Sequence, residues 1–338
     1  MDPRLVALDL GSNSILLLSA LSVAPGDLRE EAEFFRITRL ARGLRESGRL
    51  GRAAIDQTTA AIRDFLADLP RDARPVLGVA AATSAVRDAA NRNDLLDACR
   101  DLLGTAPHVL TGTDEARTTF LGAASDQPAD RGLLTVDVGG GSTEIAWGTR
   151  DACAGAVSVD VGCVRLAEQH DHFNSRNPKS EADARRAVRA LLEPALEALG
   201  TWCAARQELR LVATGGTATT LAAMHLGLVH YDRERVHNTT FSARALHDAT
   251  RRLLHLNPQQ RAVLPGVPPE RADVLPAGLL ILDTFLPCVP YPDLHPDLHI
   301  STRGLRFGLL RRLLSGDLAP TWRWPEARAT TPGGQLKT

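Results

Sequence analysis

The sequence predicts an α/β protein built from two similar domains. Apolar, strand-like runs alternate with helical stretches along the whole chain, and a strand–turn–strand unit occurs twice. The length of 338 residues is enough for two domains of ordinary size. The first copy of the unit is "ALDLGSNSILLL" and the second is "VDVGGGSTEIAW".

The two copies of the unit align without gaps. They match at an acid, a glycine and a serine: Asp9 with Asp137, Gly11 with Gly139, and Ser14 with Ser142. The patch "SDQPADRG" between the copies resembles a linker. The internal repeat therefore predicts two related domains that face each other.

The elements follow from hydrophobic spacing. In the first half we expect strands over residues 5–8, 15–20, 75–82, 108–110 and 133–138, and helices over residues 52–69, 93–103 and 113–124. Thr113 is the expected N-cap of the third of these helices. In the second half we expect strands over residues 209–213 and 299–301, and helices over residues 181–205, 242–254 and 271–286. One further helix starts at "TGGTATTLAAM", and another ends at Leu314.

Composition limits the classes of partner. The net charge is −1, so no overall field attracts nucleic acid or an anionic membrane, and a polyanionic substrate needs a local basic pocket. No apolar stretch is long enough to span a membrane. The five cysteines are dispersed, which predicts reduced thiols in a cytoplasmic protein.

Both glycine loops have the composition of phosphate-binding loops. The second leads into alternating residues rather than a helix, so it is a hairpin and not a dinucleotide fingerprint. Glycines let the backbone approach a ligand, successive N–H groups form an anion nest, and hydroxyls add donors. A plain hairpin turn is the alternative for either loop alone. The candidate phosphate ligands are Gly11, Ser12, Asn13, Ser14, Gly139, Gly140, Gly141, Ser142 and Thr143.

Asp137 and Glu144 lie on either side of the second glycine loop. Carboxylates next to a phosphate nest would repel the ligand unless a divalent cation lies between them. We therefore expect Mg²⁺, with Mn²⁺ as a substitute, held by these two acids and by Asp9 as a further candidate. Solvated turn acids, or a strand-end cap for Asp9, are the alternatives.

Three further segments contain candidate residues. Glu115 lies in the first turn of a helix, whose dipole favours the ionised form that a general base needs, although plain dipole complementarity explains it equally. Arg87 follows a buried strand and is a candidate phosphate ligand, or else a surface ion-pair partner. Gly215 and Gly216 stand between a strand and a helix, where they either expose N–H groups or permit close packing.

Two histidine-rich stretches are discounted as metal sites. These are "HDH" at residues 170–172 and "HPDLH" at residues 295–299, which includes Pro296. No set of four Cys and His ligands completes either one.

Taken together, the segments resemble the exopolyphosphatase/guanosine pentaphosphate phosphohydrolase family. The resemblance extends from about Arg4 to Leu314. It rests on the two loop motifs and on "ATSAVRDAANRNDLL", "TGTDEARTTFLGA", "SVDVGCVRLAE", "VATGGTATTLAAM", "ERADVLPAGLLILD" and "STRGLRFGLL", which occur in the family's order.

The resemblance implies an actin-like ATPase fold with two ribonuclease-H-like domains flanking a cleft. The first would comprise residues 1–126 and the second residues 127–300. A helix over residues 301–318 would pack back on the first domain, and residues 319–338 would form a flexible tail. Glu115 would be the catalytic base, Asp137 and Glu144 the Mg²⁺ ligands, and Arg87 a phosphate ligand.

The chain also departs from the family pattern. Asp114 stands where a second Glu is common, and Phe307 stands where the family usually has an acid. The extra helical domains of longer members are not expected in this chain, which favours short polyphosphate over long polymer. Because two-domain members often pair, the resemblance is compatible with a homodimer.

The predicted activity is Mg²⁺-dependent hydrolysis of terminal phosphoanhydride bonds in inorganic polyphosphate. Guanosine pentaphosphate is the alternative substrate, since both compounds present the same terminal phosphate. A nucleotide-binding regulator or kinase of the same fold, or a non-catalytic binding module, is the alternative from another class. No nucleic acid or membrane partner is expected.

Overall fold

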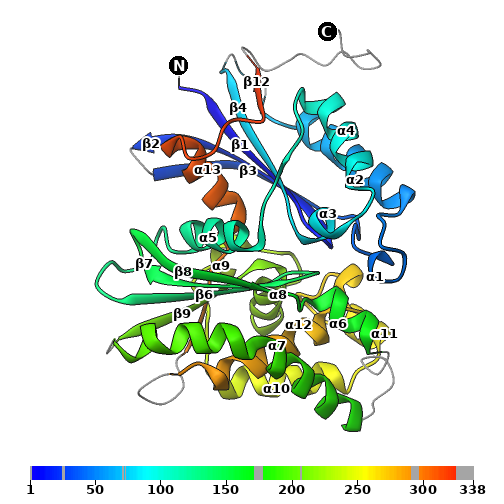
Figure 1. Cartoon of the computed structure of the whole chain (residues 1–338), viewed down its shortest axis with the longest axis vertical. Coiled ribbons are helices and arrows are strands. Elements are labelled where there is room, and N and C mark those ends of the chain that lie inside the picture. The colour runs from blue at the N-terminus through cyan, green and yellow to red at the C-terminus, as the bar shows by residue number, and fades with distance from the viewer. Residues whose placement is uncertain are drawn as a thin grey trace. The chain divides into compact units, whose positions relative to one another are not determined.

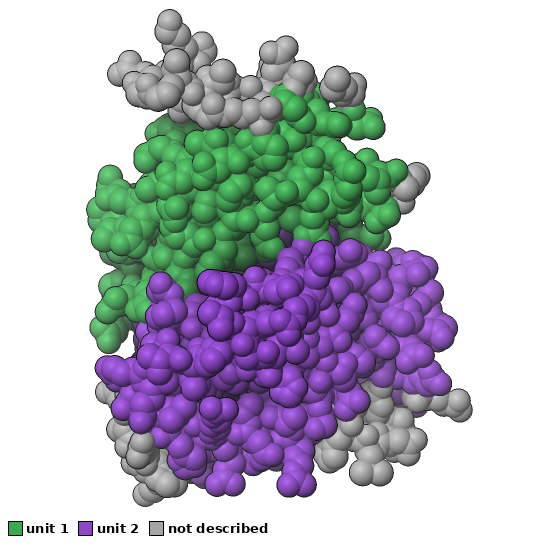
Figure 2. Space-filling model, turned by 180° about the vertical axis from the view of Figure 1, so that it is seen from behind, with its two compact units in different colours: residues 1–110, 309–338 green, residues 111–308 purple. Residues whose placement is uncertain are grey.

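The computed structural model describes residues 2–24, 27–70, 72, 74–170, 178–205, 208–290 and 297–324. It divides into two compact units (Figure 2). Unit 1 comprises Met1–Leu110 and Leu309–Thr338, and unit 2 comprises Thr111–Gly308. Both ends of the chain therefore belong to unit 1.

Unit 1 contains one sheet and the helices that follow its strands (Figure 1). The strands are β1 (Arg4–Leu10), β2 (Ser14–Ala24), β3 (Asp27–Ile37), β4 (Val76–Ala82), β5 (His108–Val109) and β12 (Trp322–Trp324). The helices are α1 (Leu44–Ser47), α2 (Arg52–Ala67), α3 (Ser84–Asp88), α4 (Arg92–Leu103) and the part of α13 (Leu305–Ser315) from Leu309 onward. The strand order is β12-β4-β1-β2-β3, and β5 also pairs with β4.

Unit 2 contains the second sheet and most of the helices. Its strands are β6 (Gly132–Val138), β7 (Thr143–Thr149), β8 (Ala152–Val159), β9 (Leu209–Thr214), β10 (Thr240–Phe241) and β11 (Leu298–Ile300). Its helices are α5 (Gly112–Ala123), α6 (Cys163–Gln169), α7 (Pro178–Ala204), α8 (Gly215–His225), α9 (Arg233–Val236), α10 (Ala243–Leu254), α11 (Pro258–Ala262), α12 (Leu275–Phe285) and the 3₁₀ turns Pro269–Arg271 and Leu286–Cys288. The strand order is β10-β11-β9-β6-β7-β8.

The two sheets share one topology. In each, three antiparallel strands are followed by a parallel strand beside the first, β4 next to β1 and β9 next to β6. A further parallel strand then pairs with that fourth strand. This is the ribonuclease-H-like arrangement, and it occurs once in each unit. The predicted internal repeat is confirmed.

The helix α5 belongs to unit 2, although the sequence predicts a domain boundary after residue 126. The helix packs on β7 and β8, and Ala116 and Phe120 share an apolar cluster with Leu133 and Ala146. Its Gly122 lies so close to the chain at Gly304 that an added Cβ would lie 2.0 Å from the Gly304 carbonyl oxygen. These contacts explain why the compact unit begins at Thr111 and not at residue 127. Within unit 2, α5 lies on one face of the sheet, and α7, α10 and α12 lie on the other (Figure 1).

Part of the C-terminal segment expected to be flexible is a strand. Trp322 pairs with Gly78 of β4, and its indole occupies the space that a side chain at Gly78 would need. The Thr321 hydroxyl accepts a hydrogen bond from the Ala80 N–H at 2.9 Å. The edge of β4 is thus covered by β12, and residues 325–338 lie outside the described part of the chain.

Among the described residues, none of the helices combines the length and the apolar character needed to cross a bilayer.

Candidate functional site

The two glycine loops form the same turn. The Gly11 N–H donates to the Ser14 carbonyl at 3.0 Å, and the Gly139 N–H donates to the Ser142 carbonyl at 3.0 Å. Each turn joins the first two strands of its own sheet. The predicted equivalence of the two loops therefore extends to their hydrogen bonding.

In unit 2 the carbonyl side of the glycine loop faces the start of α6. The Gly139 and Gly140 carbonyls accept N–H groups of the first turn of α6, and the Arg165 Nε donates to the Gly141 carbonyl at 2.8 Å. In the described part of the chain, the N–H groups of Gly140 and Gly141 donate to no protein acceptor. A loop whose carbonyls are held and whose N–H groups are available suits an anion.

In unit 1 the loop at Gly11 is held in a similar way. The Ser12 carbonyl accepts from the Ala41 N–H at 2.8 Å, and the Asn13 carbonyl accepts from the Thr38 and Arg39 N–H groups. Ser12, Asn13 and Ser14 are all buried. The loop is therefore fixed by its carbonyls, as its counterpart in unit 2 is.

Arg87 lies next to this first loop within unit 1. It occupies the last turn of α3, and the N–H of Ala85 in the same helix donates to the Ser12 hydroxyl at 3.2 Å. The Arg87 Nη1 donates to the Leu110 carbonyl at 2.9 Å, which anchors one arm of the guanidinium. Unit 1 thus brings together the first loop and the predicted phosphate-binding arginine.

Asp137 and Glu144 are direct neighbours across the β6–β7 ladder. Paired residues of an antiparallel ladder project from the same face, with their Cβ atoms about 5 Å apart. The Ser158 hydroxyl donates to Glu144 Oε1 at 2.8 Å and so orients that carboxylate. Two hard carboxylate groups on one face, at the root of an anion nest, are the donor set that Mg²⁺ accepts. The residues present therefore fit the predicted ion.

The β1–β2 ladder of unit 1 has a counterpart for only one of these two acids. Asp9 corresponds to Asp137, but it is paired with Leu16, which stands where Glu144 stands in unit 2. Unit 1 therefore has no second carboxylate at this place in its β1–β2 ladder. A metal-ligand role for Asp9 stays a prediction.

The surroundings of Asp137 destabilise the ionised form of its carboxyl group. Burial raises the pKa of Asp137 to about 6, although the positive charges of Arg271 and Arg306 act in the opposite direction. Gly215, at the start of α8, has φ +79°, and a Cβ on it would lie 2.0 Å from Asp137 Oδ1. The carboxylate is therefore enclosed by backbone that only glycine allows.

Glu115 is buried in the first turn of α5. The cap of this helix is Thr111, not Thr113, because the Thr111 hydroxyl accepts the Asp114 N–H at 3.1 Å and pairs with the Asp114 carboxylate at 2.9 Å. Asp114 thus completes the cap, whereas Glu115 is only 7% exposed. An acid that merely complements the dipole would face solvent.

Glu115 and the two acids lie on the same side of the second sheet. The next residue of α5, Ala116, packs in a cluster with Ala146 of β7 and with β6. Because side chains alternate along a strand, Ala146 shares its face with Glu144, and Asp137 is Glu144's cross-strand partner. Helix α5 therefore covers the same face of the sheet that carries Asp137 and Glu144.

Two arginines were not predicted from the sequence. Arg271 and Arg306 both act on Asp137, and an added Cβ on Gly216 would lie 1.6 Å from Arg271 Nη1. The glycine pair thus makes room for Asp137 at its first position and for Arg271 at its second. A Gly-Gly pair after a strand signals a close approach, but it does not say which distant side chain occupies the space.

Removing the charge of Asp137 is expected to stabilise the protein above pH 6 in the absence of Mg²⁺. The raised pKa means that the folded protein binds this proton more tightly than the unfolded chain does, so stability falls as pH rises toward about 6. We expect Asp137→Asn to raise Tm by about 2–6 °C at pH 8 in EDTA, and to change it little at pH 4.5. Thermal unfolding at both pH values measures this.

The exposed Asp151 supplies the matched control, since Asp151→Asn removes a carboxylate that is already solvated. Added Mg²⁺ should raise Tm of the parent protein at pH 8 and leave the Asp137→Asn protein unchanged. An unchanged or lower Tm for Asp137→Asn at pH 8 in EDTA would contradict the strained-charge account.

The described residues contain no group of three or more His, Cys, Asp or Glu side chains suited to hold a metal ion. The two discounted histidine stretches lie partly outside these residues, at 171–172 and 295–296.

Comparison with known sequences finds relatives over most of the chain. A sequence model of the Ppx/GppA phosphatase family matches residues 25–316. Exopolyphosphatase 2 of Mycobacterium tuberculosis is 36% identical over 295 residues, which cover 83% of this chain and 89% of that protein.

Comparison with solved structures agrees with the fold. An exopolyphosphatase-like protein superposes with a TM-score of 0.83 at 29% identity, covering 93% of this chain and 99% of that chain. A Ppx/GppA family member from Aquifex aeolicus gives 0.72 at 26% identity, over 94% and 99%. An exopolyphosphatase from Cytophaga hutchinsonii gives 0.82 at 22% identity, over 94% and 99%, and supports the fold alone. The predicted actin-like α/β fold is confirmed.

Proposed function

Because the chain belongs to the Ppx/GppA phosphatase family, we propose that it hydrolyses the terminal phosphoanhydride bond of inorganic polyphosphate and releases orthophosphate. The relative from Mycobacterium tuberculosis is named an exopolyphosphatase, which supports the choice of substrate. The observation that carries the proposal is the pairing of Asp137 with Glu144 across the ladder, at the root of the second glycine loop. This arrangement suits a metal-bound phosphate.

The loops would bind the phosphoryl group that is transferred to water. The N–H groups of Gly140 and Gly141 would donate to its equatorial oxygens, with the Ser142 and Thr143 residues completing the loop. They would hold this group in line with the attacking water and stabilise the negative charge on its equatorial oxygens. Within unit 1, the loop at Gly11 and the Arg87 guanidinium would provide donors of the same kind for phosphate oxygens.

Asp137 and Glu144 would hold Mg²⁺, and Mn²⁺ in its place, which would neutralise charge on the phosphate oxygens. Asp137, with a pKa of about 6, is ionised at neutral pH and ready to act as a ligand. The Ser158 hydroxyl holds Glu144 Oε1, and the second oxygen of that carboxylate, Oε2, lies 3.9 Å from the position of a Cβ built on Gly139 of the loop.

Glu115 would accept a proton from the attacking water. The water oxygen forms a bond to the terminal phosphorus while the bond from that phosphorus to the bridging oxygen breaks. The shortened chain leaves with the electron pair of that bond, and the proton on Glu115 passes later to solvent. Burial in the first turn of α5 fixes the Glu115 carboxylate in position, as this step requires.

The experiment measures orthophosphate release from short polyphosphate, long polyphosphate and guanosine pentaphosphate in parallel, with Mg²⁺ and with EDTA. We expect Mg²⁺-dependent release from polyphosphate, fastest with short chains. Faster release from guanosine pentaphosphate would make that nucleotide the substrate of the same site. Absence of release from all three, in folded protein with Mg²⁺, would refute the proposed hydrolase activity.

A further inference from the structure

The carbonyl groups of the second glycine loop are held one by one. The Gly139 carbonyl accepts the Cys163 N–H at 2.9 Å, and the Gly140 carbonyl accepts the Val164 N–H at 2.9 Å. At Gly162, the residue before α6, an added Cβ would lie 2.5 Å from the Gly140 carbonyl oxygen. The start of α6 therefore lies directly against the backbone of the loop.

The third carbonyl of the loop is held by a side chain. Among the described residues, no backbone N–H donates to the Gly141 carbonyl, and the Arg165 Nε donates to it at 2.8 Å. The backbone N–H of the half-buried Arg165 donates to the Gly140 carbonyl at 3.1 Å, so the loop and the start of this side chain are fixed together. One residue of α6 thus contacts two successive peptide groups of the loop.

The corresponding carbonyl in unit 1 is held by backbone alone. Asn13 takes the place of Gly141 in the first loop, and its carbonyl accepts the Thr38 and Arg39 N–H groups at 3.1 Å and 2.9 Å. Arg39 has φ +49°, a conformation that non-glycine residues rarely adopt. The two loops share the same turn, but unit 2 uses the Arg165 side chain where unit 1 uses two backbone N–H groups.

Holding a carbonyl also sets the direction of the N–H group in the same peptide. In a trans peptide the C=O and N–H bonds point in opposite directions, so a fixed Gly141 carbonyl fixes the Ser142 N–H. Gly141 itself imposes little restraint, because glycine tolerates most backbone conformations. If this peptide rotated, its carbonyl oxygen would replace the N–H on the side of an anion bound by the loop, and would repel that anion.

We propose that Arg165 is a positioning residue of the phosphate loop. Its Nε holds the Gly141–Ser142 peptide so that the Ser142 N–H joins the N–H groups that bind phosphate. The inference rests on the proposed function, because it concerns the same loop. Arg165 acts through the backbone of the loop, so the hydrogen bond of its Nε is required and its charge is not.

Three substitutions separate the hydrogen bond from the charge. Arg165→Gln removes the charge, but its Nε2 donor lies as many bonds from the backbone as the arginine Nε does. Arg165→Met keeps a similar length without a donor, and Arg165→Lys keeps the charge with its donor one bond farther out. We therefore expect Gln to preserve the function of the loop better than Lys does.

Binding is measured without turnover by calorimetric titration of imidodiphosphate in the presence of Mg²⁺. In this short condensed phosphate an NH group replaces the bridging oxygen. We expect Kd to rise about tenfold in Arg165→Met protein and to stay within about threefold of the parent value in Arg165→Gln protein. For short polyphosphate, kcat should fall about 30-fold with Met and less than about threefold with Gln, because a misdirected donor no longer stabilises the transition state.

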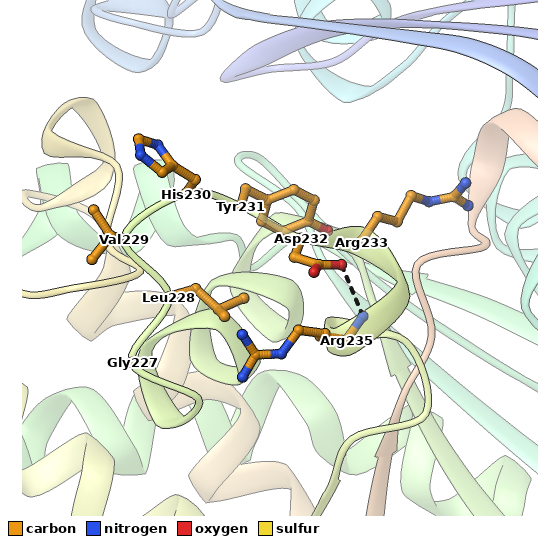
Figure 3. Close-up of a pocket in the computed structure, with 8 residues that line it drawn as sticks. All are labelled: Gly227, Leu228, Val229, His230, Tyr231, Asp232, Arg233 and Arg235. Carbon is orange, nitrogen blue, oxygen red and sulfur yellow. Dashed lines mark hydrogen bonds between the residues drawn. The ribbon is translucent and has the colours of Figure 1, made fainter.

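Arg235 supplies the matched control in unit 2. With residues 227–233 it lines a cavity of about 700 Å³, and none of these residues belongs to the glycine loop or to α6 (Figure 3). Arg235→Met removes the same charge and the same donors at this exposed position, and should keep Kd within about twofold.

Four results would overturn the proposal: unchanged Kd in Arg165→Met protein, equal losses with Met and Gln, an equal loss in Arg235→Met protein, or affinity that Lys retains and Gln loses. Should Arg165→Met fail to fold, the comparison of Lys with Gln still decides between hydrogen bond and charge. A parent protein that binds imidodiphosphate but hydrolyses no polyphosphate would contradict the proposed function alone. A parent protein that does not bind imidodiphosphate would refute both.

Discussion

The Glu115→Gln protein is expected to lose activity by about 10³-fold to 10⁴-fold in kcat, with little change in KM. The amide keeps the size of the buried side chain but cannot accept the proton of the attacking water. Phosphate binding depends on the glycine loops and the acid pair, which this substitution leaves in place. Steady-state kinetics of orthophosphate release measures both constants.

Asp114→Asn is the matched control, since it changes an acid one residue away in the same helical turn. Asp114 belongs to the cap, so this variant should lose about 1 kcal/mol of stability and keep most of its activity. If Glu115→Gln retained kcat within about tenfold of the parent, or if both variants lost activity equally, Glu115 would not be the base.

Gly215→Ala should also damage the site, although less severely than Glu115→Gln. At φ +79° a non-glycine residue is strained by about 1–2 kcal/mol, and its Cβ would overlap Asp137 Oδ1 at 2.0 Å. The carboxylate must move away from Glu144, so we expect kcat to fall by about 10²-fold and Mg²⁺ affinity to weaken. Phosphate release as a function of Mg²⁺ concentration measures both effects.

Gly104→Ala is the control variant, because it adds backbone strain without a steric clash. Gly104 has φ +93°, and the space around an added Cβ is open. This variant should therefore show a similar backbone strain and lower Tm, but it should keep its kcat and its Mg²⁺ dependence. A Gly215→Ala protein with the same kinetics as Gly104→Ala would mean that the closeness of Gly215 to Asp137 has no catalytic consequence.

The sequence predicts the elements whose apolar residues form continuous runs. β1, β4, β6 and β9 lie in the interiors of the two sheets, and the only charged residues in them are Arg4, Asp9, Asp137 and Arg210. β3 was not predicted, because its segment "DLREEAEFFRI" carries charged residues along an exposed edge strand. β8 was not predicted either, since its small residues in "ACAGAVSV" have weak strand preference.

The sequence predicts which candidate residues lie together where these residues are close along the chain. Asp137 and Glu144 flank one hairpin, and the antiparallel ladder brings them together for local reasons. Arg271 and Arg306 reach Asp137 from elements that follow it by more than a hundred residues. Such an approach depends on tertiary packing, which the spacing of residues does not encode.

The most direct measurement is hydrolysis of polyphosphate in water enriched in ¹⁸O, with Mg²⁺, followed by mass analysis of the released orthophosphate. We expect one ¹⁸O atom in each orthophosphate, and negligible release from Glu115→Gln protein. Such labelling shows that water is the nucleophile and that the terminal phosphorus is the point of attack. Transfer of the terminal phosphate to an added acceptor, with no ¹⁸O in the product, would contradict hydrolysis and indicate a kinase of the same fold.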